Sequence, residues 1–110
     1  MIPLKLKLSS SDWLMICFYL EANIKAYRQN HQSAYSRCVM YCIINARDKI
    51  KSKKTLMFKQ KPFTLTFDLA TCYAFIEFTN YMSCTDEFIY VIVQELLSRI
   101  NEHLENLNIH

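Results

Sequence analysis

Glycine is absent from this chain of 110 residues, although an average composition would supply about eight. Motifs that need a backbone without Cβ are therefore missing, including the glycine-rich phosphate loop, the dinucleotide-binding turn and the nucleophile elbow of hydrolases. This excludes most nucleotide-dependent enzyme classes. Asparagine is the other residue that tolerates a left-handed conformation at a helix end. The candidates for that role are Asn23, Asn30, Asn80 and Asn101.

Paired cysteine motifs and long apolar runs are also missing. The longest apolar run, residues 13–20, has eight residues, whereas a membrane-spanning helix needs about 20. The first residues alternate and lack the apolar core of a signal peptide. An odd number of cysteines without a C-x-x-C motif argues for reduced thiols; they are Cys17, Cys38, Cys42, Cys72 and Cys84. We therefore expect a cytoplasmic protein with no membrane segment.

Apolar residues are plentiful, at 52% of the chain, and charged residues make up 21%. Such a composition is not that of a disordered chain. The length is that of one domain, and no linker or internal repeat divides it. We expect a single domain over residues 1–110.

The periodicity of the apolar residues predicts an α+β fold of order β-α-α-β-β-α-α. Four helices would pack on a small antiparallel sheet, and Ser33 and Asp68 are expected helix caps. Phe58, Phe63 and Phe67 would share the apolar face of a hairpin. The expected strands are 2–8, 55–59 and 63–68, and the expected helices are 12–29, 34–51, 69–82 and 86–107.

Two helices have clear apolar stripes. In helix 12–29 the stripe is Trp13, Cys17, Leu20, Ile24 and Tyr27. In helix 34–51 it is Tyr35, Cys38, Val39, Cys42, Ala46 and Ile50. Residues at this spacing share one face of a helix, so both stripes are expected in the core.

Charge divides the chain into two parts. Residues 1–61 contain twelve cations and three carboxylates, a balance of +9, whereas residues 62–110 contain one cation and seven carboxylates, a balance of −6. The densest cations form the basic segment, which lies at the end of one helix and on the expected hairpin. It consists of Arg47, Lys49, Lys51, Lys53, Lys54, Lys59 and Lys61. These cations are candidates for binding nucleic acid or an acidic partner; the alternative is a solvated loop beside a helix C-terminus.

Other candidate groups have simpler explanations. Phe58, Phe63 and Phe67 could stack on single-stranded nucleic acid, but they lie on the expected core face. Cys38 and Cys42 are one helical turn apart, yet no histidine has metal-ligand spacing, so buried thiols are the simpler interpretation. Glu77 is expected on the exposed side of its helix. Arg99 is expected to pair with Glu95, four residues earlier.

No catalytic, metal or cofactor motif is present, so the sequence does not identify a function. Helices 12–29 and 86–107 contain more large apolar residues than one face needs, which favours a homo-oligomer or a protein partner. We therefore expect a non-enzymatic interaction or regulatory domain that self-associates, with head-to-tail attraction between its basic and acidic parts as one arrangement. The alternatives are a nucleic-acid-binding protein that uses the basic segment, and an enzyme with a dispersed site.

Overall fold

Two strands from distant parts of the chain form the sheet in the computed structural model, which describes residues 2–107. β1 (Leu4–Leu8) pairs antiparallel with β2 (Phe63–Phe67), and Leu6 lies opposite Leu65. Because side chains alternate along a strand, this register places the leucines and phenylalanines of both strands on one face. That face packs into the core, and the lysines and threonines between them are exposed. The α+β class and the antiparallel sheet are confirmed.

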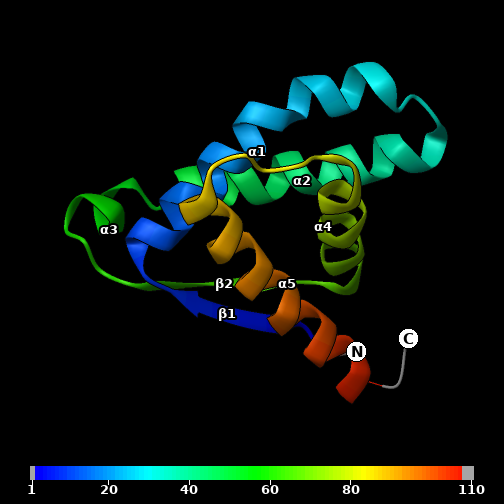
Figure 1. Ribbon diagram of the computed structural model, residues 1–110. Helices are drawn as coiled ribbons and strands as arrows, with labels where there is room; N and C mark the ends of the chain where they lie inside the picture. Colours follow the sequence, from blue (N-terminus) through cyan, green and yellow to red (C-terminus); the bar gives the residue numbers. More distant parts are fainter. Residues whose placement is uncertain (1, 108–110) are drawn as a thin grey trace.

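Residues 2–107 form five helices, of which four are long (Figure 1). Each long helix begins at a capping residue whose side-chain oxygen accepts a backbone N–H hydrogen bond, which satisfies one of the unpaired donors of the first turn. In chain order the caps are Ser9, Ser33, Asp68 and Asp86. Ser33 and Asp68 are thus the caps that the sequence predicts. The helices are α1 (Ser10–Asn30), α2 (Ala34–Lys51), α3 (Lys54–Phe58), α4 (Leu69–Tyr81) and α5 (Glu87–Asn106).

One core joins the inner face of the sheet to α1, α2, α4 and α5. All five residues of the α1 stripe are buried, as expected. Trp13 stacks on Phe63 with ring centroids 5.7 Å apart, and Phe67 stacks on Phe75 at 5.0 Å. The position of the sheet is therefore fixed by aromatic contacts with α1 and α4.

The expected hairpin is wrong, because its first strand is the helix α3. Residues 54–58 form this helix, and β2 pairs instead with β1. The connection to β2 has no glycine for a tight two-residue turn, and it reverses direction at Gln60, which has a φ of 56°. β1 also offers β2 three leucines on its inner face. Phe58 consequently lies outside the expected apolar layer, with 89% of its surface exposed.

Two smaller expectations are also wrong. Tyr35 and Cys38 are exposed on α2, because α2 packs against both α1 and α4 and its buried side is centred on Val39 and Ile43 instead. Asparagine does not supply a left-handed helix end. Within residues 2–107, the one residue with positive φ is Gln60.

Candidate interaction site

The basic segment lies at one end of the molecule, over the last turns of α2, the short helix α3 and the loop that leads to β2 (Figure 1). The structure therefore keeps these cations in one region, although on a helix rather than on a hairpin. Their environments differ, and they divide into an internally paired group and an unpaired group.

Two cations of the segment are held by carboxylates of the same chain. Arg47 Nη2 lies 3.0 Å from Asp48 Oδ1, and Lys51 Nζ lies 3.1 Å from Glu21 Oε1. The Cys17 thiol also donates to Glu21. The hydrogen bond from Lys51, followed by that from Cys17, lowers the pKa of Glu21. Arg47 and Lys51 thus have structural partners, and they are less available to a ligand than the sequence suggests.

Four of the other five cations flank an exposed aromatic ring in the sequence, and the fifth, Lys49, lies on α2. Phe58 is the last residue of α3, and 89% of its surface is exposed. Backbone hydrogen bonds from Lys59 to Thr55 and from Lys61 to Leu56 hold this short turn together. Within residues 2–107, the neighbouring lysines make no ion pair. We name this region the α3 tip and define it as Phe58 with Lys53, Lys54, Lys59 and Lys61.

The expectation that all three phenylalanines lie in the core is confirmed for Phe63 and Phe67 and is wrong for Phe58. Phe63 and Phe67 are buried, and both rings pack on core aromatics. Phe58 alone keeps a free face for a ligand. Sequence periodicity missed this difference because it placed all three on the same side of a hairpin.

An apolar hollow of about 390 Å³ lies where the first turn of α1 meets the first turns of α5. Phe88 and Val91 line it and are 82% and 63% exposed, while Ile92 is half-buried. Asp12 of α1 and Glu87 of α5 also line it. We name this site the α1–α5 hollow. The excess of apolar residues in both helices was visible in the sequence, but the proximity of Asp12 to α5 was not.

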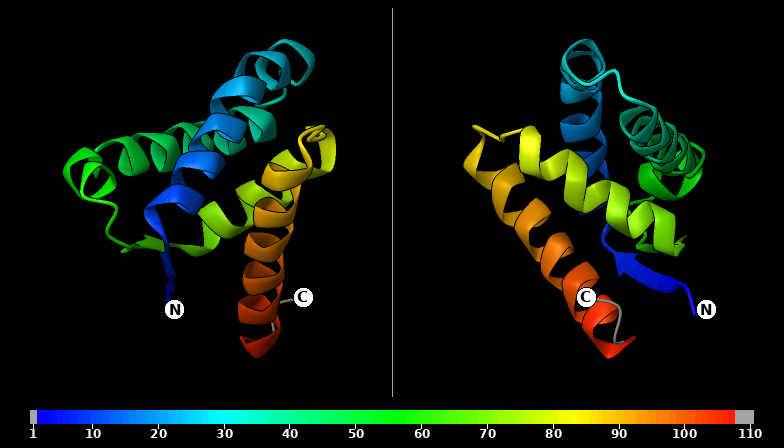
Figure 2. Two further views of the ribbon diagram at one scale, coloured as in Figure 1. Left: turned by 60° about the vertical axis from the view of Figure 1, so that its left-hand side comes forward. Right: turned by 90° about the vertical axis from the view of Figure 1, so that its right-hand side faces the viewer.

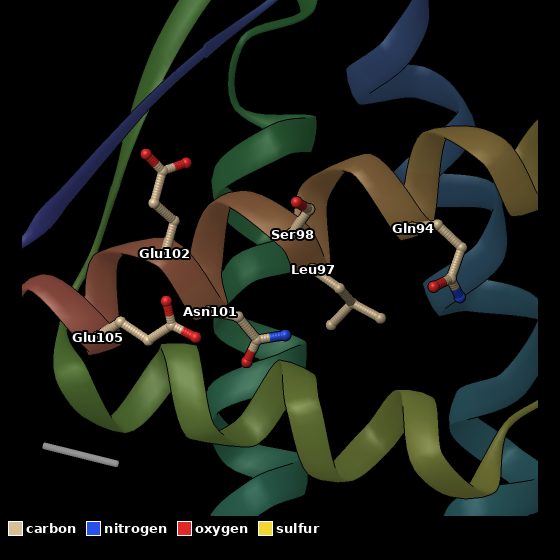
Figure 3. A pocket seen from close by; sticks show the side chains of 6 residues that line it. All are labelled: Gln94, Leu97, Ser98, Asn101, Glu102 and Glu105. Carbon is tan, nitrogen blue, oxygen red and sulfur yellow. The ribbon is translucent and has the colours of Figure 1, made fainter.

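A second hollow, of about 450 Å³, follows the middle and end of α5 and is polar. Figure 3 shows Leu97 and Asn101 pointing towards α4, whereas Glu102 points away from it. The residues that line it include two carboxylates and no cation. Arg99 lies elsewhere: its Nη1 is 3.4 Å from the Lys7 carbonyl oxygen of β1, and the expected pair with Glu95 does not form.

The cysteines do not form a metal site in the part of the chain that the structure describes, because no three His, Cys, Asp or Glu residues gather closely enough. Cys38 is exposed and Cys42 is half-buried, so the expectation of two buried thiols is wrong for Cys38. Both line a narrow apolar groove of about 160 Å³ between α2 and α4. Glu77, expected on the exposed side of its helix, is half-buried.

None of the helices in residues 2–107 is both long enough and apolar enough to cross a bilayer. No protein-family model, curated protein or solved structure matches the chain.

Proposed function

We propose that this chain is a non-enzymatic cytoplasmic interaction domain that binds other copies of itself. The observation that carries the proposal is the apolar surface at the start of α5, where Phe88 and Val91 are 82% and 63% exposed. Isolated apolar residues on a surface are common. These two, however, line one hollow together with Ile92, and apolar side chains gathered in this way are typical of protein–protein contacts.

The charge distribution favours a second copy as the partner. Four lysines lie on the α3 tip, and most of the carboxylates of residues 62–110 lie on α5, at Glu87, Glu95, Glu102 and Glu105. Two copies can therefore bring opposite charges together, whereas an arrangement with like regions in contact is disfavoured. A second copy of the chain can therefore supply both an apolar surface and the charge opposite to that of the surface it meets.

Sedimentation velocity over a range of protein concentrations tests the proposal. We expect the mean mass to rise with concentration and to remain raised in high salt, because salt does not screen apolar contacts. Phe88→Ser should weaken the association. Tyr41→Ser is a matched control, since Tyr41 is 71% exposed on α2 and does not line the hollow. A wild-type chain that stays monomeric at every concentration would contradict the proposal.

A second candidate function is binding of single-stranded nucleic acid by the α3 tip. The observation that favours it is an aromatic ring, Phe58, that is 89% exposed and is flanked in the sequence by four lysines. Lysines contact phosphates without regard to sequence, and an exposed ring can stack on a base. This candidate uses Phe58 and four lysines of the basic segment, and it needs no second copy.

Fluorescence anisotropy with labelled single-stranded DNA and RNA tests this second candidate. Binding should fall steeply as salt rises and should be lost when Lys53, Lys54, Lys59 and Lys61 are all changed to Glu. Changing Lys5 and Lys7 to Glu is the control, because these exposed cations lie on the outer face of the sheet. Absence of binding even at low salt would remove the candidate.

A further inference from the structure

We propose that the α3 tip of one copy inserts Phe58 into the α1–α5 hollow of a second copy, where the lysines of the tip face Asp12 and Glu87. This inference rests on the proposed self-association and identifies the two surfaces that meet. The tip supplies an exposed aromatic ring and positive charge, whereas the hollow supplies an apolar lining and negative charge.

The apolar parts of the two surfaces are complementary. Phe58 projects from a helix of five residues and is 89% exposed, so little of its ring contacts its own chain. The hollow has a volume of about 390 Å³ and three apolar residues, Phe88, Val91 and Ile92, in its lining. Insertion of the ring would remove exposed apolar surface from water on both partners, and this is the main source of favourable free energy in most protein associations.

The charges of the two surfaces are also complementary. Four lysines lie within five residues of Phe58 in the sequence, and two carboxylates line the hollow. The lysines are Lys53, Lys54, Lys59 and Lys61, and the carboxylates are Asp12 and Glu87. Within residues 2–107 none of these six groups forms an ion pair. Docking would therefore bring unpaired cations to unpaired carboxylates, whereas contact between two tips would bring lysine to lysine.

The occupant must be another copy, because α1 separates the tip from the hollow of the same chain. α1 packs against both α3 and α5. Figures 1 and 2 show α1 between these two helices in every view. Phe58 cannot reach its own α1–α5 hollow unless α3 moves across α1.

The proposed contact joins two different surfaces, so each copy offers one tip and one hollow. This asymmetry can be tested with two defective variants. Phe58→Ser removes the inserted ring but leaves the hollow intact, and Val91→Asp blocks the hollow but leaves the tip intact. Both positions are exposed, so neither change should disturb the core. Tyr41→Ser is again the control, and circular dichroism with thermal unfolding verifies that each variant is folded.

Sedimentation velocity of the full chain should show that Phe58→Ser and Val91→Asp each weaken self-association by about 10- to 100-fold, the range expected for exclusion of one large apolar contact. Tyr41→Ser should associate like the wild type. An equimolar mixture of the two defective variants should regain association, because the intact tip of one variant can enter the intact hollow of the other.

Three results would overturn the inference in distinguishable ways. A monomeric wild-type chain removes the proposed function together with the inference. A Phe58→Ser variant that associates like the wild type leaves self-association standing but places the contact elsewhere. A mixture that remains as monomeric as its components shows that both residues belong to one self-complementary patch, so insertion of the tip into the hollow is wrong.

Discussion

The indole N–H of Trp13 donates a hydrogen bond to the backbone carbonyl of Phe63, with 2.9 Å between Nε1 and the oxygen. The two rings are also stacked, with 16° between their planes. A single side chain thus joins the first turn of α1 to the first residue of β2, two residues after the α3 tip. This contact fixes where the tip ends and where the sheet begins.

Trp13→Phe tests the importance of this contact. The phenyl ring retains part of the packing but loses the hydrogen bond and leaves a cavity. We expect the free energy of unfolding to fall by about 1.5–3 kcal/mol, since Trp13 is fully buried. Urea denaturation followed by circular dichroism measures the change, because the variant has no tryptophan fluorescence. Phe18→Leu is the control, because Phe18 is 50% exposed and its replacement should cost little stability. If Phe18→Leu lowered the free energy of unfolding as much as Trp13→Phe, the special importance of the Trp13 contact would be contradicted.

Two buried tyrosines of α1 should respond differently to loss of the hydroxyl. The Tyr19 hydroxyl donates to the Met82 carbonyl oxygen at the end of α4. The Tyr27 hydroxyl is buried without a hydrogen bond of good geometry; burial raises its pKa, and the nearby Ser36 hydroxyl offsets this only in part. We expect Tyr19→Phe to lower the free energy of unfolding by about 0.5–1.5 kcal/mol, and Tyr27→Phe to leave it unchanged or raise it.

Each tyrosine variant is the control for the other, because both delete one oxygen from a buried ring of the same helix. Urea denaturation by circular dichroism measures both. Equal losses, or a larger loss for Tyr27→Phe, would contradict this assignment of the hydrogen bonds.

Gln60 is the residue at which the absence of glycine has a visible consequence. Its φ of 56° lies in the left-handed region, where a side chain with a Cβ is strained. Gln60→Gly should therefore raise the free energy of unfolding by about 0.5–1 kcal/mol. This gain is expected because the relief of backbone strain outweighs the entropy that glycine adds to the unfolded chain. Thermal and urea unfolding measure the gain.

Lys59→Gly is the matched control for Gln60, because its φ of −81° needs no glycine. This neighbouring change should lower stability or leave it unchanged. A similar gain in both variants would mean that loop composition, not backbone strain at Gln60, is responsible.

The ion pair between Glu21 and Lys51 should make a small contribution that depends on pH. The hydrogen bond from Lys51 lowers the pKa of Glu21 below its usual value of 4.5. A lowered pKa in the folded state means that the stabilisation is present above pH 4.5 and is lost as the pH falls below it. The Lys51 side chain is 49% exposed and the Glu21 side chain is 40% exposed, so the contribution at neutral pH is about 0.2–1 kcal/mol.

The difference in unfolding free energy between the wild type and Glu21→Gln measures this contribution. It should shrink in acid and in high salt. Glu105→Gln is the control, because Glu105 is exposed and makes no ion pair within residues 2–107. A difference that grows as the pH falls would reverse the predicted sign.

Local structure was largely predictable, and long-range contacts were not. The bounds of α2, the Ser33 and Asp68 caps and the α1 stripe follow from periodicity and from hydrogen bonds between residues three or four apart. The pairing of β1 with β2 and the Trp13–Phe63 contact join distant segments, and no local pattern encodes them.

The candidate surfaces show the same division. The lysines of the α3 tip were visible as a charge cluster, but their separation from Arg47 and Lys51 depends on Glu21 and Asp48. The hollow depends on Asp12 lying beside α5, a consequence of how α1 and α5 cross. Phe58 was assigned to the core because alternation in a short apolar segment does not distinguish a strand from a short helix.

The five thiols should react at very different rates. Cys17 and Cys72 are buried, and burial is the main cause that raises the pKa of each to about 11 from a usual value of 9.0. At pH 8 only about one in a thousand of these thiols is ionised, and the thiolate is the reactive form. Cys38 is exposed. We expect iodoacetamide to modify Cys38 first in the folded chain, and Cys17 and Cys72 only when the chain unfolds.

Mass spectrometry after timed alkylation measures the order of modification. Cys42 and Cys84 are half-buried and should react at intermediate rates, because burial raises the pKa of Cys42 and the Cys84 thiol donates to the Asp86 carbonyl oxygen. Cys38→Ser should remove the fast phase and leave the others unchanged. Rapid modification of Cys17 or Cys72 without denaturant would show that α1 or α4 opens readily, since neither thiol can be reached while these helices remain packed in the core.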